Sequence, residues 1–357
     1  MSSAATTTDV HALEWTISDG VIRLRHWGTD QVYSLPASPA LKCKIGSAES
    51  CSIRIADRLV SREHASLTHQ EGRWLISDLG SKNGLRHDGG QLAAFAITPG
   101  IEIGIGATTL IAESPRSMVL HRFLARILGW AIDRRPAVDL ALRSVRLAAT
   151  HRVALTVAGD GDLVALAQAL HRHTLGADRP FVVCDPRREH MEASVRSAAN
   201  RQRGLPGLAA ALGGSLCVRR DRLPPDFPAV LARLRQPTTR VQLLVCGQDH
   251  RDHEPSQAAP IHVPSLKARG SERPRIIDEY VVDAAAALAV SPTTFTRDDR
   301  AWVQKHSASS LPEIEKATLR LTALRASHNH IEAAARLGMA PVSLSRWLGR
   351  RTPPKDL

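Results

Sequence analysis

The sequence lacks several features that would assign it to a class at once. No apolar run approaches the ~20 residues of a membrane-spanning helix, and the start, "MSSAATTTDVHALEW", has neither the basic start nor the apolar core of a signal peptide. No two of the five cysteines form a CxxC pair, and there is no internal repeat or long low-complexity tract. We therefore expect a cytoplasmic protein with reduced, buried thiols and no membrane contact.

The chain is strongly basic. Its 357 residues carry a formal net charge of +12, and the pI is near 10.2. This favours anionic partners, but the excess is mostly arginine spread along the chain. Bulk basicity argues for solubility and non-specific attraction rather than for one partner.

The chain divides into segments of different pattern, and its length allows two or three domains. Short alternating strands over residues 15–113 predict an all-β sandwich or barrel, and "ESPRSM" (113–118) is interpreted as a linker. Strands alternating with helices over 119–262 predict a mostly parallel α/β sheet. Helical patterns follow over 264–308 and 309–357. The fold class is therefore multidomain: all-β, then α/β, then all-α.

One motif cluster lies in the β segment: "KIGSAESCSIRIADRLVSREHASL", followed by "GRWLISDLGSKNGLRHDG". In order and spacing it resembles the forkhead-associated (FHA) domain. The resemblance implies a phosphothreonine-binding sandwich. The residues it implies for the phosphopeptide site are Gly46, Ser47, Ser61, Arg62, His64, Asn83 and Gly84.

The residue types suit this chemistry. Phosphothreonine carries nearly two negative charges and three acceptor oxygens, which hydroxyl donors, loop amides and a guanidinium satisfy. We expect Ser61 and Arg62 to meet the phosphate, Asn83 to hold the peptide backbone and His64 to brace the loop. Ser47 stands where the family most often has arginine. A β-sandwich that docks an unphosphorylated partner is the alternative.

The lost arginine at position 47 needs a substitute if the phosphate is to be bound. The cations near the motif that the sequence offers as substitutes are Lys44, Arg54, Arg58 and Lys82.

The middle segment begins with "HRVALTVAGDGDLVALAQALH", which has the strand–turn–helix pattern of a phosphate-binding loop. With "PFVVCD", "GGSLCVRR", "VQLLVCG" and "VPSLKARG" in order, it resembles the AAA+ domain of bacterial enhancer-binding proteins, the activators of sigma-54 RNA polymerase. The framework matches, but the catalytic parts do not. The positions of this degenerate nucleotide site are Gly159, Gly161, Asp162, Leu163, Arg219 and Arg220.

Five family features are missing. No lysine follows the glycines, and Arg219 and Arg220 replace the two acids that hold magnesium. The sigma-contacting loop has no counterpart, the polar stretch 248–260 replaces the arginine-finger segment, and Pro312 aligns with the sensor arginine. We predict a pseudo-ATPase with no catalytic residues, no metal and no cofactor. Its strand–turn–helix is kept because apolar residues such as Leu155, Leu166 and Leu170 build a core.

The last segment, 309–357, contains a long helix followed by "HIEAAARLG" and "PVSLSRWLGRR", two short helices around a Gly-containing turn. It resembles the Fis-type helix-turn-helix that ends the enhancer-binding proteins. The resemblance implies a homodimer on near-palindromic double-stranded DNA. The implied DNA-binding residues are Val342, Ser343, Ser345 and Arg346 at base edges, with Arg350 and Arg351 near phosphates. A three-helix protein-docking unit is the alternative.

Together these modules predict a cytoplasmic bacterial transcription regulator that is not an enzyme. Recognition of a phosphothreonine protein, a Ser/Thr kinase or its substrate, is coupled to DNA occupancy. Two alternatives stay open: a divergent but active sigma-54-type ATPase, and a phospho-dependent signalling scaffold that does not bind DNA.

Overall fold

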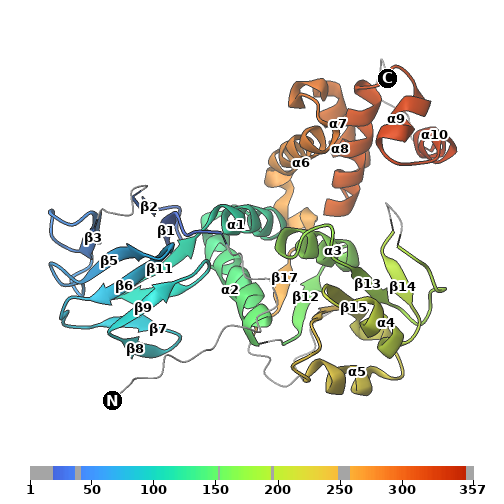
Figure 1. The fold of residues 1–357 in the computed structure, drawn as a ribbon. Helices are drawn as coiled ribbons and strands as arrows, with labels where there is room; N and C mark the ends of the chain where they lie inside the picture. The colour runs from blue at the N-terminus through green and yellow to red at the C-terminus, as the bar shows by residue number, and fades with distance from the viewer. Residues whose placement is uncertain (1–18, 37–41, 152, 194–196, 248–257, 351–357) are drawn as a thin grey trace.

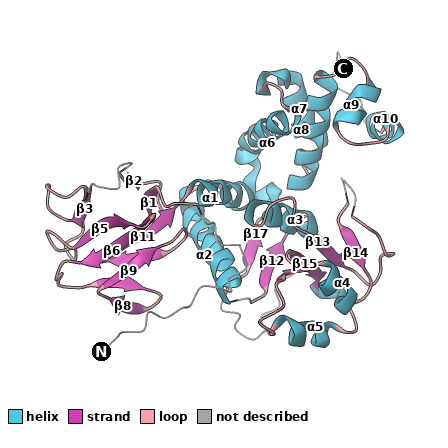
Figure 2. Cartoon of the chain, in the orientation of Figure 1, coloured by secondary structure: helices cyan, strands magenta, loops and turns pink. Residues whose placement is uncertain are grey.

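The structure is a computed structural model that describes residues 19–36, 42–151, 153–193, 197–247 and 258–350. A β sandwich, a parallel sheet with its helices, and a group of C-terminal helices follow one another along the chain (Figure 1). Figure 2 shows that strands are confined to the first two parts and that the third is helical. The stretch predicted as a polar loop at 248–260 lies almost wholly outside the described residues.

The sandwich consists of two mostly antiparallel sheets. Sheet A has the strand order β2-β1-β11-β10-β7-β8, and sheet B has the order β4-β3-β5-β6-β9. The strands are β1 (Arg23–His26), β2 (Val32–Ser34), β3 (Cys43–Gly46), β4 (Ile53–Arg54), β5 (Ala65–Gln70), β6 (Arg73–Asp78), β7 (Leu85–His87), β8 (Gly90–Leu92), β9 (Ala94–Ile97), β10 (Glu102–Ile105) and β11 (Thr108–Glu113).

Alternation of apolar and polar residues builds the sandwich core. Along β5, Ala65 and Leu67 are fully buried while the residues between them are partly exposed. Facing side chains such as Ile45, Ile76 and Ile103 complete one cluster between the sheets. The predicted all-β fold is confirmed, although the sequence did not indicate β7, β8 and β9.

The linker predicted at 113–118 is wrong. Glu113 is the buried end of β11, and Ser114 caps helix α1 (Pro115–Leu128) in a capping box with Ser117. A 3₁₀ turn, η1 (Ile132–Arg134), joins α1 to α2 (Arg135–His151). The chain therefore passes from the sandwich into a helical hairpin without an intervening linker.

A buried ionic network joins the sandwich to α2. Arg25 Nε donates to Glu113 Oε1 at 2.7 Å, and Arg25 Nη2 donates to Asp139 Oδ1 on α2 at 2.5 Å. All three side chains are at most 3% exposed. Arg143 of α2 also pairs with Glu102 of β10 and lies over the Trp27 ring, 4.5 Å from its centroid. The junction is thus held by specific polar contacts.

The middle part is the predicted parallel sheet. Sheet C has the order β14-β13-β15-β16-β12-β17, with parallel pairing throughout. Its first strand, β12, lies between β16 and β17, so the connections leave β12 and β16 in opposite directions. Ligands of open α/β sheets bind at such a switch point, outside the carboxyl ends of the strands. The strands are β12 (Leu155–Gly159), β13 (Phe181–Cys184), β14 (Ala199–Arg201), β15 (Ser215–Arg219), β16 (Gln242–Cys246) and β17 (Ile261–Val263).

Helices accompany sheet C and form the rest of the chain. The core residues predicted from the opening stretch, Leu155, Leu166 and Leu170, are buried in one cluster that also takes in α1, α2 and the C-terminal helices. The remaining elements are α3 (Leu163–Thr174), α4 (Gly204–Ala210), η2 (Arg220–Arg222), α5 (Phe227–Leu234), η3 (Leu266–Glu272), α6 (Arg273–Leu288), η4 (Pro292–Thr294), α7 (Arg297–His306), α8 (Leu311–Arg325), α9 (His330–Arg336) and α10 (Pro341–Gly349).

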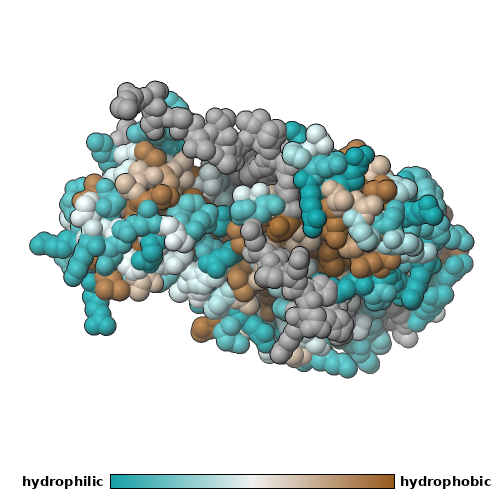
Figure 3. All heavy atoms as spheres, turned by 90° about the horizontal axis from the view of Figure 1, so that it is seen from below, coloured by the Kyte–Doolittle hydropathy of each residue, from teal (hydrophilic) through white to brown (hydrophobic). Residues whose placement is uncertain are grey.

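The surface is mixed in polarity. On the face seen from below, hydrophilic side chains gather toward the two ends, and hydrophobic ones form small patches between them (Figure 3). Among the described residues, none of the helices has the length and apolarity that a membrane crossing needs.

Candidate functional site

Three loops meet at one end of the sandwich and form a continuous surface. The loop after β3 is tied to the loop before β5 because Ser47 N donates to Ser61 O and Ala48 N donates to Arg62 O. The loop after β6 joins them: Lys82 N donates to Ser61 Oγ at 3.1 Å, and Asn83 Nδ2 donates to Leu59 O at 2.7 Å. The predicted motif residues are therefore brought together.

His64 holds two of these loops from within. Its side chain is fully buried, Ser61 N donates to its Nδ1 at 3.1 Å, and its Nε2 lies 3.1 Å from Gly84 O. Because Nδ1 accepts a hydrogen bond, Nε2 carries the proton and donates to the carbonyl. His64 thus occupies the bracing position that the sequence predicted.

Gly46 and Ser47 serve loop geometry. A Cβ on Gly46 would overlap the carbonyl oxygen of Arg62, so only glycine permits this approach of the two loops. Ser47 Oγ donates to Val60 O at 3.0 Å, which uses the hydroxyl proton inside the protein. Ser47 therefore ties the loops together, and the charge of the arginine it replaces must come from elsewhere.

The structure separates the four substitute cations into two groups. Lys44 pairs with Glu63 at 2.8 Å, and Arg54 pairs with Glu49 at 3.3 Å. Arg58 and Lys82 are exposed on the joined loops, and neither has an ion-pair partner within the described residues. With Arg62, which is also exposed, they give the surface three cations around the Ser61 hydroxyl.

Two aspartates that the sequence reasoning did not single out shape these loops. Hydrogen bonds from the backbone of Leu59 and Ala107 lower the pKa of Asp57. Burial raises the pKa of Asp78, but hydrogen bonds from Ser81 and Gly80 outweigh it, so the net pKa is lowered. The turn signal "SDLGS" around Asp78 was a readable hint of this Asx turn.

Comparison with protein families identifies this region. The family model for the FHA domain matches residues 43–106, from β3 to the turn after β10. Residues 43–106 belong to an FHA domain. The match spans the three loops described above, so the loop surface is the candidate site of the FHA domain.

Solved structures similar to the chain are also FHA domains. One, from a structural and functional analysis of phosphothreonine-dependent FHA interactions, is 24% identical, covers 26% of this chain and 94% of its own, and has a TM-score of 0.24. The FHA domain of CT664 from Chlamydia trachomatis is 23% identical over 26% and 95%, with a TM-score of 0.24. EmbR from Mycobacterium tuberculosis, in complex with a low affinity phosphopeptide, is 23% identical over 28% and 27%, with a TM-score of 0.25. A search of curated proteins finds no match.

The second candidate site lies at the switch point of sheet C. Gly159 ends β12 with φ +117°, and a Cβ there would overlap the carbonyl oxygen of Val263 on β17. Asp160 Oδ1 accepts from Gly161 N at 3.0 Å, and Asp162 Oδ1 accepts from Ala165 N as the N-cap of α3, which begins at Leu163. Both acids are thus used in the turn itself.

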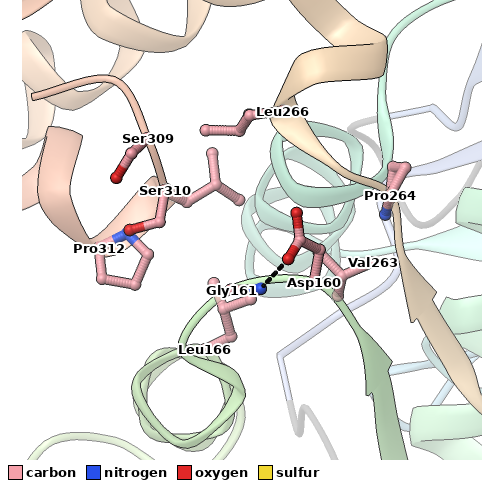
Figure 4. Close-up of a pocket in the computed structure, with 10 residues that line it drawn as sticks. Asp160, Gly161, Leu166, Val263, Pro264, Leu266, Ser309, Ser310 and Pro312 are labelled. Carbon is pink, nitrogen blue, oxygen red and sulfur yellow. Dashed lines mark hydrogen bonds between the residues drawn. The ribbon is translucent and has the colours of Figure 1, made fainter. Parts of the chain in front are cut away.

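The hollow beside this turn is nearly closed. It lies between the loop after β12 and the first turn of α8, with Asp160 and Gly161 facing Ser310 and Pro312 (Figure 4). Its cavity volume is about 10 Å³, on the order of one water molecule. Within the described part of the chain its lining contains no cation, and Arg219 and Arg220 do not reach it.

The third candidate site is α10. Val342 is 65% exposed, and Ser343, Ser345 and Arg346 lie on the same exposed side, while Leu344 and Leu348 are buried. Trp347 packs edge-on against Trp302, with the ring centroids 5.7 Å apart. Arg350 is exposed at the end of the helix, and Arg351 lies outside the described residues.

The pair α9–α10 has the predicted helix–turn–helix geometry. Asn329 caps α9, Gly338 turns the chain with φ +59°, and Met339 N donates to Ala334 O at 2.8 Å. Ala333 and Ala334 are fully buried, which lets the helices approach closely. Across the described residues, no His, Cys, Asp and Glu cluster could hold a metal ion.

Proposed function

We propose that the protein is a DNA-binding regulator in which an FHA domain recognises a phosphothreonine-containing protein and the C-terminal helices bind DNA. The middle domain supports this assembly without hydrolysing ATP. The observation that carries the proposal is the loop surface of the FHA domain, where Ser61 and three exposed cations converge.

Phosphate recognition is supported by the donors that remain available there. Ser61 Oγ accepts from Lys82 N, so its own proton is free to be donated to a phosphate oxygen. Arg62 and Lys82 flank it and supply charge for a dianion. Asn83 keeps its carbonyl oxygen and its second amide hydrogen for the backbone of a bound peptide.

Loss of ATP hydrolysis is supported by the second site. A polyphosphate placed at the loop after β12 would meet Asp160 and Asp162 instead of a lysine. The first turn of α8 also fills the space it would need. A divergent but active ATPase is the alternative, and turnover of magnesium-ATP by the pure protein would favour it.

DNA binding is supported by the exposed face of α10. A helix of this width fits the major groove, and Arg346 is its one arginine between Pro341 and Gly349. A scaffold whose terminal helices only dimerise is the alternative. We expect DNA-bound protein to be a homodimer, because Fis-type domains, which this segment resembles, bind paired half-sites.

Two titrations test the proposal. The first measures fluorescence anisotropy of the full chain on labelled fragments of its own upstream DNA across a range of salt, beside Arg346→Ala. We expect wild type to prefer one fragment and the variant to lose that preference. Binding no better than that of any basic protein would overturn DNA recognition.

The second titration uses a phosphothreonine peptide library and the same peptides without phosphate. We expect binding of phosphorylated peptides only, weakened in Arg62→Ala. Equal binding of both forms would overturn phosphate recognition and favour a sandwich that docks unphosphorylated partners.

A further inference from the structure

A row of arginines follows the carboxyl edge of sheet C on the side away from β12. In the parallel pairing, Cys184 at the end of β13 lies opposite Arg201 at the end of β14 and Val218 of β15, so the residues that follow leave the sheet at one edge. Neighbouring strands lie ~4.8 Å apart, so these three strand ends span roughly 10 Å. The arginines at or beside them are Arg187, Arg188, Arg201, Arg203, Arg219 and Arg222.

This edge has more positive charge than its acids can balance. Residues 185–222 contain eight arginines and four acidic residues, whereas residues 19–113, which include the FHA domain, contain ten of each sign. Glu192 is paired with Arg201, and Asp221 with Arg219 and Arg222. The exposed Arg187 and Arg203 have no ion-pair partner within the described residues. They are therefore available to an external anion.

A buried carboxylate organises the row. Asp185 is 2% exposed, and its Oδ2 lies 3.3 Å from Arg222 Nη1 and 3.8 Å from Arg188 Nε. Its Oδ1 accepts from Arg187 N at 3.0 Å. One acid thus fixes the positions of three consecutive or neighbouring arginine residues.

The loop that carries Arg187 and Arg188 is also held against the sheet. Asn200 of β14 is buried, its Nδ2 donates to the carbonyl oxygens of Arg188 and Glu189, and its Oδ1 accepts from Asp185 N. A surface fixed in this way loses little conformational entropy when a ligand binds.

We propose that this arginine edge, defined by Arg187, Arg188, Arg201, Arg203, Arg219 and Arg222, is a second DNA contact that binds the phosphodiester backbone. Guanidinium groups match phosphate oxygens in pairs, and backbone contacts position a protein without reading sequence. This inference rests on the proposed DNA binding.

The rest of the molecule favours this partner over an acidic protein. The exposed face of α10 offers few charges, so it needs backbone contacts from elsewhere in the chain to hold a duplex. The C-terminal helices are seated over the same edge of sheet C: the first turn of α8 faces the end of β12, and Arg172 of α3 pairs with Glu315 of α8. The edge and the DNA-binding helices therefore belong to one body.

The test compares two double variants of the full chain that remove the same charge. Arg187→Gln with Arg203→Gln removes the two unpaired cations of the edge and leaves no acid without a partner. Arg233→Gln with Arg235→Gln is the matched control. Both control residues are exposed near the end of α5, which returns the chain to the amino end of β16.

The measurement is the affinity for one labelled duplex as a function of NaCl concentration. We expect the slope of log affinity against log salt to lose about 1.8 in the edge variant, ~0.9 for each phosphate contact, and to stay unchanged in the control. Equal slopes in all three proteins would overturn the inference while leaving DNA binding by α10 intact. No DNA binding by wild type would overturn both.

A third arm uses poly-glutamate as a probe. If the edge variant loses poly-glutamate binding while its DNA slope stays that of wild type, the edge is a docking surface for an acidic protein and the DNA assignment is wrong.

Discussion

The FHA loops and the loop after β12 are built alike and differ in their chemistry. Each has a strand end whose glycine allows backbone to approach backbone, Gly46 against Arg62 and Gly159 against Val263. Each has a turn capped by an aspartate, Asp78 and Asp162. Around the first turn the exposed charges are cations, and around the second they are acids.

This difference shows that loop geometry and ligand chemistry depend on different residues. Gly159 and the α3 cap keep sheet C folded although no cation remains to hold a phosphate. In the FHA domain the same kind of geometry also carries Ser61 and Arg62. A site can therefore lose its function while the fold that presented it stays stable.

The largest effect is expected from adding one methyl group at either glycine. Gly46→Ala and Gly159→Ala each force a Cβ into a carbonyl oxygen, and we expect each to lower the free energy of unfolding by about 3 kcal/mol. Denaturant unfolding measures this. Gly90→Ala on β8 meets only an ordinary contact and should change stability by less than about 1 kcal/mol. If Gly159→Ala behaved like Gly90→Ala, the loop after β12 would have lost its geometry along with its chemistry.

The next effect is a pH dependence of the middle domain. Burial against α1, with the Arg126 guanidinium nearby, lowers the pKa of His173 to about 4. The unfolded chain takes up this proton near pH 6.5, so stability is full above pH 6.5 and falls as the pH drops toward 4. The loss reaches up to roughly 3 kcal/mol. His173→Gln should remove most of this slope in urea unfolding measured at several pH values. An unchanged slope would mean that another group is responsible.

A smaller effect is expected on peptide binding by the FHA loops. Arg62→Ala should weaken binding of a phosphothreonine peptide by about 1.5–3 kcal/mol, the range for a hydrogen bond to a charged group, with the melting temperature unchanged. Calorimetric titration measures it. Arg73→Ala, exposed on β6 at the far end of β5, removes the same charge and should leave affinity as in wild type. Equal losses in the two variants would indicate general charge attraction.

The smallest effect separates cap from ligand at Asp162. Asp162→Ala should cost about 1 kcal/mol of stability, while Asp162→Asn should cost a few tenths, because asparagine caps a helix as well as aspartate does. We expect no ATP turnover in wild type or in either variant. ATP turnover in wild type that Asp162→Ala abolishes would show that the site still works.

Much of the fold followed from local patterns. The FHA motif around Ser61 and Asn83 is local in sequence and was predicted, as were the parallel strands and the helix pair around Gly338. Strand β8 was missed because all three of its residues are exposed and give no apolar alternation. Helix α1 was missed although Ser114 and Pro115 are ordinary signals of a helix start.

The sites were less predictable where they depend on distant contacts. Ser47 gave no sign in the sequence that its hydroxyl bonds to Val60, nor Lys44 that it pairs with Glu63. The closing of the hollow beside Gly161 by Pro312 joins residues far apart in the chain. Such pairings follow from packing, which no local pattern encodes.

The buried network of Arg25, Glu113 and Asp139 determines where the molecule can be cut. A fragment ending at the last sandwich strand would expose the Arg25–Glu113 pair and remove its third member on α2. The smallest piece suited to expression and peptide screening therefore runs through His151, about forty residues beyond the segment that the FHA family model matches.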